Sequence, residues 1–134
     1  MAGYSGTPLV RKLGIRPGSV VVILGAPAGF DELLEGLPDD VTLRTRARGR
    51  FDLAISFQTA RRVLERRVAS VLAGMDRDGA LWAAWPKRAS GVPTEVTEDV
   101  VREVALPIGL VDVKVCAIDE TWSGLKLVWR RERR

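Results

Sequence analysis

The chain has 134 residues, a formal net charge of +4 and no histidine. This is the length of one domain, and it allows a hydrophobic core that needs no disulfide or metal. The lack of histidine excludes Ser-His-Asp and Cys-His mechanisms, and the single cysteine, Cys116, excludes intramolecular disulfides and cysteine-rich zinc sites. The sequence has no apolar run of 18 residues and no signal-peptide pattern, so we expect a cytoplasmic protein with Cys116 reduced.

Helical and strand patterns alternate along the chain. The run Ser19–Leu24 (SVVVIL) is typical of a strand buried on both faces. Thr7, Thr59 and Thr97 each precede a helical pattern and are predicted to cap it. In chain order we predict helix 7–14, strand 19–24, helix 30–37, strands 42–47 and 51–57, helix 59–72, turn 76–79, strand 80–85, loop 86–93, helix 97–105, strand 110–118, turn 119–124 and strand 125–131, with fraying over 130–134.

This order predicts an open α/β sheet in a single domain over residues 1–134. Right-handed crossovers make the central strands parallel. Such sheets bind ligands outside the carboxyl ends of their strands, at the point where the strand order reverses. The loops expected at that edge are 25–29, 58–59, 86–93 and 119–124.

Three segments resemble parts of the class I methyltransferases that use S-adenosylmethionine (SAM). VVVILGAPAGF resembles their glycine loop, and FDLAISF and AGMDRDGALWAAWPK resemble two of their strands. Over nearly its full length the chain also resembles a bacterial family of small Rossmann-like proteins, a domain of unknown function, through YSGTPLVRKLGI, WPKRASGVPTEVTEDVVRE and VCAIDETWSGLKLVWR. The methyltransferase resemblance implies a three-layer Rossmann-like sandwich with strand order 2-1-3-4-6-5 and strand 6 antiparallel. A fold alone does not establish an activity.

The chain departs from the methyltransferase pattern at both expected cofactor contacts. Its loop is Gly-x-x-x-Gly with Pro27 inside, and Ile23-Leu24 precede it where the family has an acidic residue. Arginines follow the second strand, where the family places an acid that holds the ribose. We therefore expect SAM to bind weakly or not at all, and the cofactor stays unknown.

Six residues make up the predicted ligand site at the carboxyl edge. Gly25 and Gly29 let a ligand approach the backbone, although a plain strand-to-helix turn explains them too. Lys87 follows a strand end, where it would hold an anion or sit as an ordinary surface lysine. Asp119, Glu120 and Trp122 form either a ligand wall beside Lys87 or a turn with a packed aromatic. No catalytic residue and no metal ligand is predicted.

Arg44, Arg46, Arg48 and Arg50 alternate and would share one face of an extended strand. They would then either grip phosphate or protect a sheet edge, and the sequence leaves both open. The chain has 17 arginines and 4 lysines, which is typical of a GC-rich genome. Because no recognition motif is present, nucleic acid is not expected as a partner.

The favoured functional hypothesis is a Rossmann-like module that binds a small anionic metabolite or nucleotide without catalysis. The alternative is a diverged SAM-dependent methyltransferase, and the order of the elements favours it. No membrane partner is expected, and homo-oligomerisation is left open.

Overall fold

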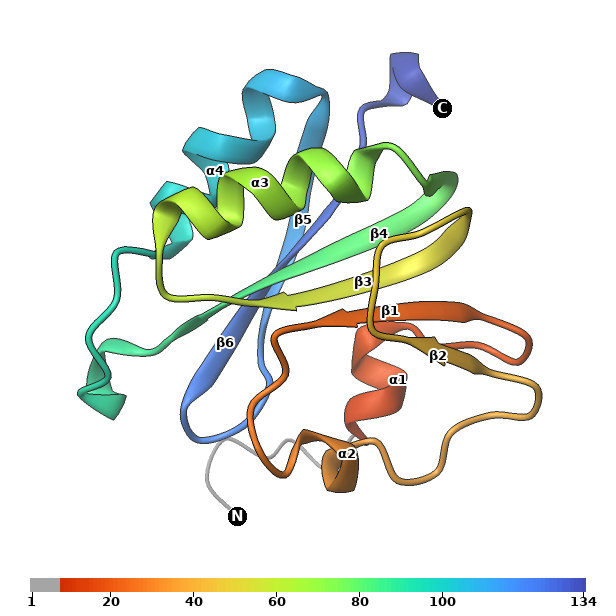
Figure 1. The fold of residues 1–134 in the computed structure, drawn as a ribbon, viewed down its shortest axis with the longest axis horizontal. Coiled ribbons are helices and arrows are strands. Elements are labelled where there is room, and N and C mark those ends of the chain that lie inside the picture. The colour runs from red at the N-terminus through yellow and green to blue at the C-terminus, as the bar shows by residue number, and fades with distance from the viewer. Residues whose placement is uncertain (1–7) are drawn as a thin grey trace.

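The computed structural model describes residues 8–134 and arranges them in three layers (Figure 1). A six-stranded sheet lies in the middle, with α3 and α4 against one face and α1 and α2 against the other. We call these the α3 face and the α1 face. The elements are α1 (Leu9–Leu13), β1 (Val20–Leu24), α2 (Phe30–Leu33), β2 (Thr42–Arg44), β3 (Phe51–Phe57), α3 (Arg61–Leu72), β4 (Met75–Pro86), η1 (Arg88–Ser90), α4 (Glu98–Ala105), η2 (Leu106–Ile108), β5 (Leu110–Ala117), β6 (Trp122–Trp129) and η3 (Arg131–Arg133).

The strand order is β2-β1-β3-β4-β6-β5, which confirms the predicted topology. β1 is parallel to β2 and β3, β3 is parallel to β4, and β6 is antiparallel to both β4 and β5. The chain leaves β1 through α2 on the α1 face, whereas it leaves β3 through α3 on the opposite face (Figure 1). The strand order therefore reverses between β1 and β3, where sheets of this kind bind their ligands.

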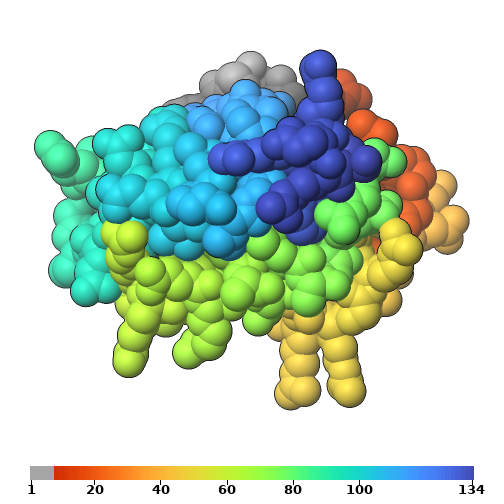
Figure 2. Space-filling view, turned by 90° about the horizontal axis from the view of Figure 1, so that it is seen from above, coloured from red at the N-terminus to blue at the C-terminus, as the bar shows by residue number. Residues whose placement is uncertain are grey.

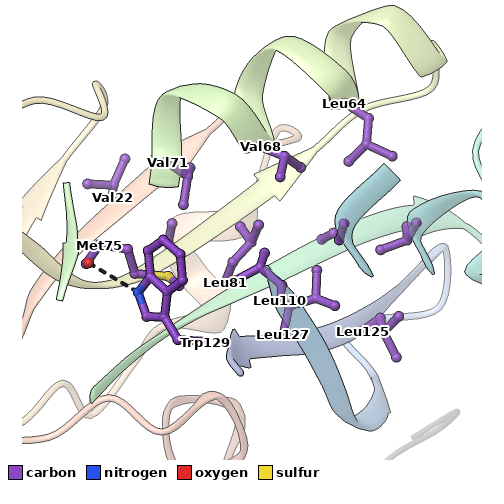
Figure 3. Close-up of a cluster of buried hydrophobic side chains, with 14 of the residues drawn as sticks. Val22, Leu64, Val68, Val71, Met75, Leu81, Leu110, Leu125, Leu127 and Trp129 are labelled. Atoms are coloured by element: carbon purple, nitrogen blue, oxygen red, sulfur yellow. Dashed lines mark hydrogen bonds between the residues drawn. The ribbon is translucent and has the colours of Figure 1, made fainter. Parts of the chain in front are cut away.

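Each face of the sheet buries its own hydrophobic cluster. On the α3 face, Leu64, Val68 and Val71 point from one stripe of α3 onto the sheet (Figure 3), at the spacing of an amphipathic helix. On the α1 face, the Trp82 indole N–H donates to the Leu13 carbonyl at 2.9 Å. A helix as short as α1 is not stable by itself, so this bond and the apolar contacts around it hold α1 on the sheet.

The start of β4 differs from the prediction. β4 begins at Met75, so residues 76–79 belong to the strand and do not form the predicted turn. A Cβ on Gly79 would lie 2.6 Å from the Asp52 carbonyl oxygen, so β4 approaches β3 too closely there for any side chain. Gly79 therefore lies where the register between β3 and β4 shifts, between the pairs Phe51–Met75 and Leu53–Ala80, and β4 continues through this irregularity.

Of the three predicted helix caps, Thr7 lies outside the described residues, and the other two have different outcomes. Thr97 caps α4 as predicted, because its hydroxyl oxygen accepts from the Val100 N–H at 3.2 Å. Thr59 does not cap α3, whose N-cap residue is Ala60. The Glu95 carboxylate instead accepts from the Arg61 N–H at 2.9 Å, so the loop after β4 supplies the cap.

The carboxyl-terminal arginines are ordered rather than frayed. β6 ends at Trp129, and the chain continues into η3. The Arg130 guanidinium donates to the Leu106 carbonyl at 2.7 Å, and that of Arg134 donates to the Trp129 carbonyl at 2.8 Å. These bonds to backbone oxygens tie the last residues to η2 and to the end of β6. Between residues 8 and 134, no helix has the length and apolar character needed to cross a membrane.

Candidate functional site

The carboxyl ends of β1 and β3 lie side by side at the point where the strand order reverses. Leu24 pairs with Ser56 in parallel register, so the next residues of both strands meet at the same edge. The loop after β1 leads to one face of the sheet and the loop after β3 leads to the other, so the two loops diverge and leave space between them. We call the carboxyl ends of β1, β3 and β4 the rim.

Gly25 and Gly29 have different surroundings at this rim. Gly25 has φ +68°, and a Cβ there would lie 2.6 Å from the Phe57 carbonyl oxygen. Its backbone is therefore pressed against the end of β3, and only glycine fits. Gly29 also has a positive φ, +86°, but a Cβ there would meet nothing within 4 Å. Gly29 is the N-cap of α2 and lies in open space.

Arg67 of α3 reaches the rim, and the sequence analysis missed it. Its guanidinium donates to the Phe57 carbonyl at 2.6 Å, and it lies 2.8 Å from where a Gly25 Cβ would be. Burial, and then the charge of Arg66, lower the pKa of the Arg67 guanidinium. The one available signal is its position between Leu64 and Val71 on the buried stripe of α3, which predicts a side chain directed partly toward the sheet.

A second missed residue, Gln58, holds β3 and β4 together just beyond the rim. Its side-chain amide is buried and donates to the carbonyls of Ser56 at 3.1 Å and Ala84 at 2.8 Å. Its amide oxygen accepts from the Ser56 hydroxyl. Because every polar group of this pair is engaged, the pair positions the strand ends and leaves no free donor for a ligand.

Lys87 and Asp119 are brought together, but through the backbone. The Lys87 amine donates to the Asp119 carbonyl at 2.7 Å, and the Lys87 N–H donates to the Thr121 carbonyl at 2.7 Å. The Asp119 carboxylate accepts from the N–H groups of Thr121 and Trp122 at 2.8 and 2.7 Å. This is the hydrogen bonding of an Asx turn. Glu120 is exposed at its tip.

An aromatic row connects the two groups of predicted site residues. Phe57 packs edge-on against Phe30 of α2 at 4.9 Å between ring centroids, and against Trp122 of β6 at 5.2 Å. Phe30 and Phe57 are buried, whereas Trp122 stays half-buried beside Lys87. The row therefore links the helix after the glycine loop to the turn that holds Lys87. The assignment of the six residues to a ligand site remains a prediction.

The second strand cannot supply the usual ribose contact. Arg44, its last residue, pairs with Val22, two residues before β1 ends at Leu24. The Arg44 guanidinium turns back and donates to the carbonyls of Arg48 at 3.0 Å and Arg50 at 3.2 Å. The predicted strand to Ala47 and its alternating arginine face therefore do not form, because this side chain folds the segment into a loop.

Beside the rim, a wide hollow of about 860 Å³ opens between the start of α3 and the loop after β4. Arg61, Arg62, Glu65 and Thr94 are among its lining residues, and it contains none of the six predicted ones. The Glu95 N–H donates to the Thr59 carbonyl at 2.8 Å and joins the two loops. No group of three potential metal ligands occurs within the described part of the chain.

Solved structures similar to this fold include SAM-dependent methyltransferases. The fold is methyltransferase-like. A SAM-dependent methyltransferase from Aquifex aeolicus matches with a TM-score of 0.67 and 12% identity, covering 89% of this chain and 86% of that one. Magnesium protoporphyrin IX methyltransferase from Synechocystis PCC 6803 with bound S-adenosylhomocysteine (SAH) matches with a TM-score of 0.60 and 14% identity, covering 91% and 78%.

Sequence comparison gives no such match. No protein-family model matches the chain, and neither does any curated protein sequence. The resemblance to a small Rossmann-like bacterial family therefore rests only on the segments quoted for it. At this low identity, the structural matches establish the methyltransferase-like Rossmann fold and do not establish an activity. An activity has to be argued from the residues at the rim.

Proposed function

We propose that this protein is a diverged SAM-dependent methyltransferase that binds SAM and SAH over Gly25 at the rim. The observation that supports this most is the convergence of the Gly25 backbone and the Arg67 guanidinium where the strand order reverses. Gly25 is exposed and has no side chain, so a ligand can reach the backbone of the loop. This proposal replaces the module without catalysis as the first hypothesis.

The chain's own residues fit one end of such a ligand better than the other. The Arg67 guanidinium has five N–H donors, and those not engaged by Phe57 suit a carboxylate, which both SAM and SAH carry. The ribose would lack its acidic partner, because β2 ends short of the rim. The loss of a hydrogen bond to a charged group costs about 1.5–3 kcal/mol, or roughly 10- to 150-fold in affinity. Weak binding of SAM therefore remains the prediction.

The lack of histidine does not oppose this proposal. Bound SAM supplies an electrophilic methyl group, and methyl transfer depends chiefly on holding the reacting atoms in line. In this chain, Gln58 and Ser56 fix the ends of β3 and β4, and the row of Phe30, Phe57 and Trp122 fixes the loops on either side. Lys87 would then attract an anionic acceptor to the other end of the row.

A module that binds a small anion or nucleotide without catalysis is the second candidate. Arg67 favours it, because a half-buried guanidinium at the rim attracts any carboxylate or phosphate and repels the sulfonium of SAM. The two candidates differ in their ligands. The methyltransferase proposal requires SAM and SAH to bind, whereas the module would prefer other anions.

Calorimetric titration with SAH and SAM tests the proposal. We expect SAH to bind more tightly than SAM, since SAH lacks the sulfonium charge. We expect Arg67→Gln to weaken SAH binding about tenfold or more. Arg66→Gln removes the same charge from the exposed neighbouring position and should leave SAH binding within about twofold, since exposed charges are well screened. No heat from either ligand at millimolar concentration, together with stabilisation by NADP or a nucleotide in a thermal-shift screen, would overturn the proposal in favour of the module.

A further inference from the structure

The positive charge of this protein is concentrated in one part of the chain. Residues 41–75 contain eight arginines and only two acidic residues, Asp52 and Glu65. This segment carries +6, whereas the whole chain carries +4. The other 99 residues therefore have a net charge of −2, and the basic character belongs to the stretch from β2 to the end of α3.

The two arginine-rich parts of this segment lie on the same face of the sheet. The loop 45–50 crosses from β2 to β3, and its Ala47 packs into the α3-face cluster. It meets the carboxyl end of α3, where the Phe51 N–H donates to the Gly74 carbonyl at 3.1 Å. Figure 2 shows long side chains from the loop (yellow) and the start of α3 (yellow-green) projecting on the same side into solvent.

Half of these arginines are engaged within the protein and half are not. The engaged ones bond to backbone carbonyls or carboxylates; they are Arg44, Arg50, Arg61 and Arg67. The remaining four are exposed and form no ion pair with any residue between 8 and 134. We call them the arginine patch: Arg46, Arg48, Arg62 and Arg66.

We propose that the arginine patch binds the phosphate backbone of a nucleic acid. The patch runs along α3, whose 12 residues span about 18 Å. Six phosphates of one strand span about 17 Å along a duplex axis. A row of guanidinium groups on this scale suits a repeating phosphate chain better than one small anion, since each fork can take one phosphate.

The surroundings of the patch favour nucleic acid over a protein or a membrane. A protein partner or a lipid surface requires apolar anchors beside the charges. The nearest exposed large apolar residue in sequence, Leu43, pairs with Val21, which packs into the α1-face cluster, so it points away from the patch. The exposed residues that follow Arg66 on α3 are Ala69 and Ser70, and Ala73 just after the helix is exposed too. From the sequence alone, nucleic acid is not expected as a partner, because no recognition motif is present. The proposal rests on where the fold places these arginines.

Fluorescence anisotropy with the full chain and labelled 20-nucleotide probes tests this proposal. A single-stranded RNA and a DNA duplex are titrated at several salt concentrations. Four phosphate contacts predict a slope of log K against log[salt] of about −3.6 for the duplex and about −2.8 for the single strand. For the duplex, affinity should fall roughly 150-fold between 50 and 200 mM salt. Whichever of the two probes, the single-stranded RNA or the DNA duplex, binds more tightly identifies the type of nucleic acid.

Two double variants separate the contributions of the two segments. Arg46→Ala with Arg48→Ala should reduce the steepness of the salt slope by about two, and Arg62→Ala with Arg66→Ala by about two more. Arg11→Ala with Arg131→Ala removes the same charge from exposed positions outside the patch and should leave the slope unchanged. All six side chains are exposed, so circular dichroism should show the native fold in every variant.

Three results would overturn the proposal. They are no binding at 50 mM salt, an equal loss of affinity in the patch and control variants, and tighter binding to anionic vesicles or an acidic peptide than to either nucleic acid. The outcome is independent of the proposed methyltransferase function. SAH binding depends on Arg67 and should survive in both patch variants, whereas nucleic-acid binding should survive Arg67→Gln.

Discussion

Replacing Gly25 and Gly29 by alanine, one at a time, tests the geometry of the rim. Both residues have a positive φ, so each alanine adopts a left-handed conformation at a cost of about 1–2 kcal/mol. At Gly29 this is the whole expected cost, because the new methyl group meets open space. At Gly25 the methyl group would lie 2.6 Å from the Phe57 carbonyl oxygen and 2.8 Å from the Arg67 guanidinium. Overpacking of this kind adds about 1–3 kcal/mol.

The expected loss in the free energy of unfolding is therefore roughly 2–5 kcal/mol for Gly25→Ala and about 1–2 kcal/mol for Gly29→Ala. Urea denaturation followed by tryptophan fluorescence measures both values. SAH titration on the folded variants adds a second comparison, since Gly25→Ala fills space at the proposed binding position and Gly29→Ala does not. Equal losses of stability, or a larger loss for Gly29→Ala, would show that the Gly25 backbone is not pressed against the end of β3.

Three other substitutions test single contacts. Glu95→Ala should lower the free energy of unfolding by about 1 kcal/mol because it removes the cap of α3. Thr59→Ala should change the free energy of unfolding by less than about 0.5 kcal/mol. A larger loss for Thr59→Ala than for Glu95→Ala in urea denaturation would contradict the assignment of the cap. Lys87→Ala should lower the free energy of unfolding by about 1 kcal/mol, since the Lys87 amine is half-buried and bonded to a carbonyl. The same substitution should weaken the binding of a ligand at the rim. An unchanged free energy of unfolding would show that the bond contributes nothing to stability. Burial, followed by the charges of Lys114 and Arg16, lowers the pKa of the Lys126 amine, so its ammonium form opposes folding at neutral pH. Lys126→Met should therefore stabilise the protein at pH 7 by less than about 1 kcal/mol, and the gain should shrink as pH rises through the lowered pKa; a gain that grows toward pH 10 would contradict this sign.

The sequence predicted those features that depend on local patterns. β3 occupies Phe51–Phe57 as predicted, because its run is largely apolar and all of it except Asp52 is buried. The Thr97 cap is a contact between residues three apart, so the local sequence contains the information. The strand order was available only through the resemblance to methyltransferases, since alternating elements alone allow several orders.

The features that the sequence missed depend on contacts between distant residues. Glu95 caps a helix 34 residues earlier in the chain, and no local pattern identifies such a partner. Arg67 reaches the rim only because α3 lies across β3 with that side chain turned toward Phe57. The segment after β2 alternates as a strand would, yet Arg44 bonds to two backbone carbonyls and folds it into a loop. The patch formed by this loop and α3 exists only in the folded chain.

In the proposed function, a SAM-type ligand binds over Gly25, where β1 and β3 end. Titration of isotope-labelled protein with SAH, followed by amide chemical shifts, locates the ligand directly. We expect the largest shifts at residues 25–29 and 57–58 and at the Arg67 side-chain N–H groups. Shifts confined to residues 59–65 and 93–95 around the hollow beside the rim, or the absence of any shift at millimolar SAH, would contradict binding over Gly25.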